Sequence, residues 1–375
     1  MIQRNIGENM SELSVVHQIS LIGFVLGIVF GATAQKTHFC TMGAISDIFF
    51  FGDWNRMRAW ILAMTVAMLG SQFLHIKGIV DLSESIYLSP NLGWFGAVLG
   101  GLMFGFGMTL GGGCGNKTLV RLGAGNLKSL VVALCIGLFA YMTLRGIIGL
   151  ARVSLETFTV VELNSWGFES QGLPDFLSIF GLSNETCRII LLILLAGGGL
   201  VFCFKCGKFR ASKIDIIAGF LIGLSVPVAW YVTGVFGYDD FEPTPLASLS
   251  FIAPVGEGVQ YLMTFTGSTI NFGIAVVAGV IFGSFLAAKI AGEFKIEAFN
   301  GTTDMIYHIF GGALMGIGGV LALGCTIGQG VTGLSTLAMG SFIALFSILL
   351  GGLCGMKYLE EGTFKGAIRG LFIKG

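Results

Sequence analysis

Charged side chains are scarce in this chain of 375 residues: Asp, Glu, Lys and Arg make up 11% of it, against roughly a quarter in soluble domains. So few charges cannot cover a surface that faces water, which excludes an ordinary soluble globular protein. The 21 basic residues equal the 21 acidic ones, so no net charge points toward nucleic acid or an acidic partner. Because 54% of the residues are apolar, we expect the lipid bilayer to be the main solvent.

Motifs of ATP use, metal binding and disulfide scaffolds are also missing. No Gly-x4-Gly-Lys-Ser/Thr stretch occurs, so ATP-driven pumping within this chain is unsupported. The eight cysteines lie mostly in apolar runs and lack the spacing of a small disulfide-bonded domain. Cys203 and Cys206 have C-x2-C spacing, but one such pair without neighbouring histidines is a weak zinc motif. We predict no metal, no cofactor and no enzymatic activity.

Hydrophobic segments dominate what is present, and a helix needs about 20 apolar residues to cross a bilayer. The candidates are 15–35, 58–75, 92–110, 127–149, 187–204, 214–237, 249–266, 271–290, 305–323 and 335–356. Several are short or interrupted, so we expect about nine true spans, with any remainder re-entrant or interfacial. We expect the first to be a transmembrane helix and not a cleaved signal peptide, since a single basic residue precedes it and acidic residues follow that one. The predicted fold class is an all-α polytopic transmembrane bundle with broken or re-entrant helices at its centre.

Parts of the sequence occur twice. Gly100–Cys114 aligns without gaps on Gly311–Cys325, and seven of the fifteen positions are identical. A weaker match places Gly23-Phe24-x-x-Gly27 on Gly219-Phe220-x-x-Gly223, in the same order. This pattern predicts internal duplication, which in transporters puts substrate sites at the repeat interface near the bilayer midplane.

The duplication suggests a division of one integral membrane domain. Residues 1–150 are the predicted first half, 151–185 an extramembrane connector, and 186–375 the second half. Whether the halves are inverted or parallel depends on the span count and stays open. The basic run from Lys205 to Lys213 follows a span directly and is predicted to be cytoplasmic by the positive-inside tendency.

Each copy of the repeat ends in a glycine-cysteine turn, at Gly111–Lys117 and at Leu323–Gly330. Four glycines and one cysteine in five residues do not continue a helix comfortably, which predicts a break followed by a new helix. Non-helical backbone at membrane depth is tolerated only where it is buried in protein or lines a cavity. Helix N-termini and glycine-rich N–H nests attract anions, so two matched breaks predict an anion path.

The alternative for each turn is close helix packing around an inert thiol. We favour the functional interpretation because two matched copies occur. The predicted substrate-binding residues are Cys40, Cys114, Cys325, Gly113, Gly115, Gly324, Asn116 and Gln329. Cys40 has no cysteine counterpart in the second half, near Phe236, so the two ends of the path should differ. On its own, the cluster His38-Phe39-Cys40 is more typical of a membrane end than of a site.

Three stretches resemble the YeeE/YedE family of sulfur transporters: Lys36–Asp47, Gly100–Gly107 running into Gly113-Cys114, and the second block around Cys325. The resemblance covers most of the chain and is weakest over 150–185 and 238–268. It implies thiosulfate uptake across the inner membrane, with thiols passing the ion along a narrow path by S–H···S hydrogen bonds. By motif position that role falls on Cys40, Cys114 and Cys325.

Several alternatives remain. The family also includes members linked to selenium metabolism, and these motifs do not separate a selenium-compound permease from a thiosulfate permease. Cys203 and Cys206 could instead serve a membrane thiol redox or sulfur-relay protein, or the basic face could be a scaffold for soluble sulfur-transfer proteins. The predicted partners are thiosulfate or a related sulfur or selenium anion and the lipid bilayer, with a cytoplasmic sulfur-carrier protein as a further candidate.

Overall fold

The computed structural model describes residues 15–237 and 244–363, and its secondary structure is almost entirely helical. Within these ranges, nine helices are long and apolar enough to cross a membrane, so the predicted all-α polytopic class and the expected number of spans are confirmed. The spanning elements are α2 (Val15–Thr37), α4 (Asn55–Ile76), α5 (Trp94–Leu110) continued by α6 (Gly115–Gly123), α7 (Leu127–Leu144), α10 (Asn184–Phe204), α12 (Lys213–Tyr231), α14 (Phe272–Ala291), α15 (Thr302–Leu321) and α16 (Met339–Glu361). Residues ahead of α2, on which the choice between a first span and a signal peptide partly depended, lie outside the described ranges.

Shorter elements account for the tenth hydrophobic segment and the connectors. Segment 249–266 holds only the 12-residue helix α13 (Ile252–Met263), which is too short to span a bilayer. It is therefore the one of the ten candidate segments that is not a transmembrane span. The middle connector contains α8 (Ile147–Thr159) and α9 (Leu173–Leu177), and the predicted boundary at residue 150 lies within α8. Strands β1 (Asn91–Leu92) and β2 (Val161–Glu162) pair antiparallel.

Glycines set the packing of two outer helix pairs, α2 with α14 and α4 with α12. Gly31 of α2 faces Val280, and Gly23 faces Phe272, so the residue numbers rise together and the helices run parallel. Gly219 of α12 packs on the carbonyl of Ala59, where an added Cβ would lie 2.7 Å from the oxygen. Small residues allow such close approach, which is the main source of helix association in a bilayer.

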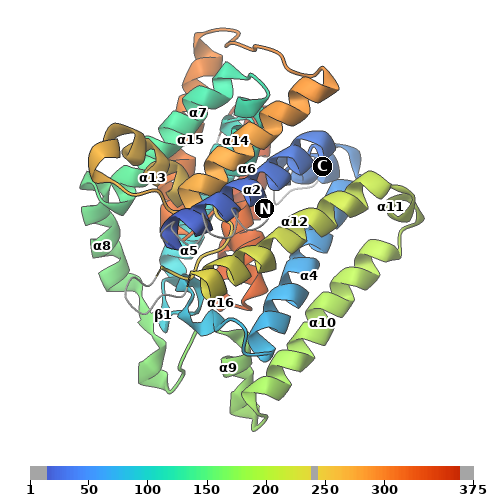
Figure 1. Ribbon diagram of the computed structural model, residues 1–375, viewed down its shortest axis with the longest axis vertical. Helices are drawn as coiled ribbons and strands as arrows, with labels where there is room; N and C mark the ends of the chain where they lie inside the picture. Colours follow the sequence, from blue (N-terminus) through green and yellow to red (C-terminus); the bar gives the residue numbers. More distant parts are fainter. Residues whose placement is uncertain (1–14, 238–243, 364–375) are drawn as a thin grey trace, which may run out of the picture.

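At the centre α5 crosses α15 in the antiparallel sense, since Gly100 faces Gly318 and Gly107 faces Gly311. α16 packs along α5, and α7 packs along α15, each in parallel. These directions agree with nine successive crossings of alternating direction. Figure 1 shows α10 at the edge of the bundle against α4, away from this central group.

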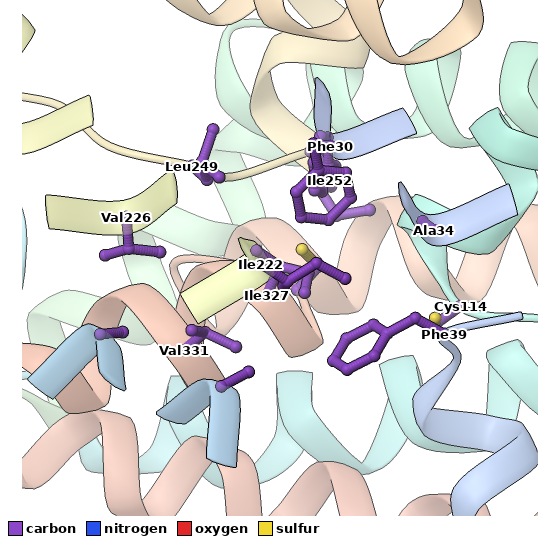
Figure 2. Close-up of a cluster of buried hydrophobic side chains, with 14 of the residues drawn as sticks. Phe30, Ala34, Phe39, Cys114, Ile222, Val226, Leu249, Ile252, Ile327 and Val331 are labelled. Carbon is purple, nitrogen blue, oxygen red and sulfur yellow. The ribbon is translucent and has the colours of Figure 1, made fainter. Parts of the chain in front are cut away.

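The two ends of the bundle differ in their contacts. At one end Lys208 pairs with Asp53 at 2.9 Å, and Lys128 pairs with Asp304 at 2.8 Å. At the other end β1 pairs with β2, and the backbone N–H of Leu173 donates to the carbonyl of Leu337. Between the ends lies an apolar core that includes Phe39, Ile252 and Ile327, drawn in Figure 2.

Candidate functional site

Cys114 sits at a break between α5 and α6. α5 ends at Leu110, Gly112 adopts the left-handed conformation (φ 68°), and the N–H of Gly113 donates to the carbonyl of Met108 at 2.9 Å. This is the bond by which a left-handed residue terminates a helix. Cys114 then caps the N-terminus of α6 in an extended conformation. The predicted break followed by a new helix is confirmed here.

Cys325 follows a break with the same hydrogen bonding. Leu323 is left-handed (φ 55°), and the N–H of Gly324 donates to the carbonyl of Gly319 at 2.7 Å. A new helix begins at Thr326 and widens into the π-helix η8 (Gly328–Gly333). The second predicted break is therefore also present, although a leucine stands where the first copy has a glycine.

Cys40 follows a third turn of this kind, which was not predicted from the sequence. His38 is left-handed (φ 52°), the N–H of Phe39 donates to the carbonyl of Ala34 at 3.2 Å, and Cys40 caps α3 (Thr41–Ser46). The break is hard to find in sequence because no glycine marks it. Histidine is one of the few residues enriched in the left-handed region, which is the one available signal.

The three cysteines form a continuous series inside the protein. The side chain of Cys40 neighbours that of Cys114, and Cys114 in turn neighbours Thr326, the first residue of the helix after Cys325. A Cβ placed on Gly115 would lie 4.0 Å from the Cβ of Cys325. Cys114 and Cys325 are 0% exposed and Cys40 is 7% exposed. Figure 2 shows the Cys114 sulfur beside Phe39.

Backbone N–H groups at helix starts surround these sulfur atoms. The N–H of Gly43 donates to Cys40 Sγ at 3.5 Å, and the N–H of Gly328 donates to Cys325 Sγ at 3.3 Å. The Cys114 thiol donates to Asn116 Oδ1 at 2.7 Å. Each helix start adds the positive end of a helix dipole, an arrangement that is typical of anion sites.

Several buried polar atoms around the thiols have no hydrogen-bond partner within the described ranges. They are Asn116 Nδ2, Thr41 Oγ1 and Thr326 Oγ1, on residues that are 0–2% exposed. An unpaired buried donor costs about 1–3 kcal/mol, so such groups are available to a ligand. Gln329 is placed differently, because its Nε2 donates to the carbonyl of Ala322 and so holds the second turn.

A cavity of about 360 Å³ leads to the second turn from the end of the bundle that carries β1 and β2. Its wall includes Tyr87, Trp230, Ser250, Leu323 and Gly324. The cavity therefore ends at the turn that precedes Cys325. Neither Tyr87 nor the irregular segment around Ser250 carries a sequence signal that could have identified it.

Cys203 and Cys206 lie apart from this series. Cys203 donates to the backbone carbonyl of Arg58 at 3.2 Å, and Cys206 lies after α10, at the start of α11 (Gly207–Ala211). The backbone N–H of Phe209 lowers the pKa of the Cys206 thiol. Among the described residues no group of three or more His, Cys, Asp and Glu side chains could hold a metal ion.

Comparison with known proteins identifies a family. The family model described as sulphur transport matches residues 36–354. The thiosulfate transporter TsuA of Escherichia coli strain K12 is 26% identical over 350 residues, covering 88% of this chain and 92% of that protein. TsuA of Spirochaeta thermophila is 28% identical over 335 residues, covering 88% and 96%. The probable transporter YedE of Salmonella typhimurium is 32% identical over 112 residues, 29% of this chain and 26% of that protein.

Proposed function

The chain belongs to the sulphur transport (YeeE/YedE) family, and we propose that it takes up thiosulfate across the inner membrane along the three-cysteine series. It is a multi-pass membrane transporter of a sulfur-containing anion and not an enzyme. The observation that supports the proposal most is the contact of Cys40 with Cys114, with Gly115 next to Cys325. No other described cysteine joins this series.

The thiols match the chemistry of thiosulfate. Its terminal sulfur is large, polarisable and negatively charged, so it accepts hydrogen bonds from uncharged S–H donors, which are themselves soft and weak. A thiolate would repel the dianion, so each thiol acts as a neutral donor. Loss of hydration is offset by the positive ends of the helices after Cys40, Cys114 and Cys325. Because no single contact is strong, the ion can leave one thiol for the next.

The charges at the two ends of the bundle support an orientation. The connection between α10 and α12 carries Lys205, Lys208 and Arg210. At the opposite end, the charged residues of the connector from Glu156 to Asp175 are all acidic. Positive residues favour the cytoplasmic side. In this orientation the ion enters through the cavity next to Leu323, meets Cys325 first, and leaves past Cys40.

We infer further that the halves are an inverted repeat. The order α2, α4, α5, α7 in the first half corresponds to α12, α14, α15, α16 in the second, and α10 lies between them. One extra crossing reverses every later helix, in agreement with the antiparallel contact of α5 with α15. Inverted repeats place broken helices at the midplane with their N-termini toward an anionic substrate.

Uptake of radiolabelled thiosulfate into proteoliposomes tests the proposal. We expect the unmutated protein to accumulate thiosulfate and Cys114→Ala to abolish accumulation. Cys354→Ala is the matched control, because this half-buried thiol on α16 takes no part in the series. Unchanged uptake by Cys114→Ala would refute the relay, and failure of the unmutated protein to transport thiosulfate would refute the substrate. A cytoplasmic sulfur-carrier partner stays a prediction. Co-purification of such a carrier with the unmutated protein, lost when Lys205, Lys208 and Arg210 are neutralised, would support it.

A further inference from the structure

Lys117 brings an ammonium group to the cysteine series. It lies on the first turn of α6, three residues after Cys114, and its stem packs over Gly113, where an added Cβ would lie 3.3 Å from Lys117 Cγ. The neighbours of its ammonium include the thiols of Cys40 and Cys114 and the guanidinium groups of Arg56 and Arg121. Lys117 therefore lies where the ion would pass between the first two thiols and the cytoplasmic end.

No carboxylate within the described ranges pairs with Lys117 at 4 Å or less. The neighbouring cations are already engaged: Arg56 binds Asp47 at 3.1 Å, and Arg121 donates to the carbonyl of Gly112 at 2.8 Å. Glu293, the acidic neighbour of His38, accepts from Gln35. A half-buried ammonium without a partner is costly, and an ionisable side chain inside a membrane protein usually has a functional reason.

A buried donor without a partner stands next to Lys117 in the chain. Asn116 precedes Lys117, is 0% exposed, and its Nδ2 has no partner among the residues that the structure describes. The oxygen of the same amide accepts from the Cys114 thiol. An ion beside Cys114 would thus meet an unpaired N–H donor and a full positive charge, and the Cys114 thiol would donate to it by turning its S–H away from Asn116 Oδ1.

We propose that Lys117 selects the charge of the transported ion by binding its oxyanion end while the Cys40 and Cys114 thiols hold its sulfur end. The proposal rests on the proposed function and specifies the substrate class: dianions that carry a polarisable sulfur atom at one end and a sulfonate-type oxygen group at the other. A monoanion with a polarisable sulfur atom gains less binding free energy from the ammonium. A dianion without such a sulfur atom gains less binding free energy from the thiols.

The test compares Lys117→Met with Lys117→Arg. Methionine keeps an unbranched stem of similar length over Gly113 and removes the charge. Lys357→Met is the matched control, because Lys357 is a paired cation at the end of α16, away from the thiols. Binding of thiosulfate, thiocyanate and sulfate is measured by calorimetry on the purified full chain in detergent, together with the thermal shift that each anion produces and the KM and maximal rate of uptake.

We expect Lys117→Met to weaken thiosulfate binding about tenfold or more, as for loss of a buried charged partner, and thiocyanate binding by clearly less. Lys117→Arg should recover part of the loss. Removing a half-buried charge that has no carboxylate partner among the described residues should leave the midpoint of thermal unfolding without ligand unchanged or raised, whereas the thiosulfate-induced shift should disappear. A merely structural lysine would lower the midpoint and would affect all three anions alike.

The outcomes separate this inference from the proposed function. Equal binding of thiosulfate by Lys117→Met and the unmutated protein would overturn the role of Lys117 while thiosulfate transport stands. If the unmutated protein binds another of these anions in place of thiosulfate, and loses it in Lys117→Met, the role of Lys117 holds and the proposed substrate is wrong. If none of the three anions binds, both are wrong.

Discussion

The crossing of α5 with α15 makes a quantitative prediction for Gly100→Ala. An added Cβ at Gly100 would lie 2.5 Å from the carbonyl oxygen of Gly318 and 2.6 Å from the amide nitrogen of Ala322. Ordinary contact begins at 3.4 Å, so the methyl group lacks about 0.9 Å of space, and the two nearest blocking atoms belong to the backbone and cannot turn aside. The two helices must separate, and forced overpacking of this kind costs typically 1–3 kcal/mol.

The same displacement reaches the site, because Ala322 is the first residue beyond α15 in the turn before Cys325. We therefore expect Gly100→Ala to lower both the midpoint of thermal unfolding and the rate of thiosulfate uptake. Gly197→Ala is the matched control: Gly197 lies within α10 with nothing within 4 Å of an added Cβ, so alanine should stabilise that helix by up to about 1 kcal/mol. Thermal unfolding in detergent and liposome uptake measure both effects. The packing argument is wrong if Gly100→Ala unfolds at or above the unmutated midpoint.

Two further predictions concern the thiols. Mild oxidation with diamide should join Cys40 and Cys114 in a disulfide, with their two protons and two electrons passing to the reagent, and should stop uptake until dithiothreitol is added. Peptide mapping by mass spectrometry detects the bond, and a disulfide that instead joins either thiol to Cys354 would contradict the observed series. Asn116→Asp places a negative charge beside Cys114, where two like charges about 4 Å apart repel by about 4 kcal/mol at an effective dielectric constant of 20. Uptake should therefore fall more than tenfold in Asn116→Asp and less in Asn116→Ala, and equal losses in the two variants would argue against an anion at this position.

The spans and two of the three breaks could be predicted because their signals are local. Long apolar runs require a membrane, and Gly111 to Gly115 cannot continue a helix. The length of α13 could not be predicted in the same way. Segment 249–266 is apolar enough for a span, and only the folded structure limits its helix to Ile252–Met263. The break before Cys40 was missed for a related reason. His38 carries a side chain that a helix tolerates, so its left-handed conformation is imposed by packing, including the stacking of Phe39 on Trp60 at 5.1 Å.

Contacts between distant segments were also beyond what the residues alone predict, although the family resemblance puts Cys40, Cys114 and Cys325 on one path. Nothing in the chain order indicates that Cys40 lies against Cys114, or that Tyr87 and Ser250 border one cavity, because these contacts join segments from different helices. Lys117 ends the first glycine-cysteine turn in the sequence. That no carboxylate among the described residues pairs with it is a property of the packed structure alone.

The three turns share one backbone geometry and differ in their surroundings. In each, a left-handed residue stands two positions before the cysteine: His38, Gly112 and Leu323. Leu323 borders the cavity at one end, while the turn at Gly112 has Lys117 packed against it.

The helices after the two repeated cysteines also differ. Cys325 is followed after 13 residues by the cap of α16, whereas Cys114 is followed after 12 by the cap of α7, and the extra residue is accommodated in the π-helix η8. A π-turn within an α-helix often marks a functional site. An inverted repeat alone would give two equal ends. Under the proposed function, this insertion, the cavity next to Leu323 and the ammonium of Lys117 distinguish the end at which the ion enters from the end at which it leaves.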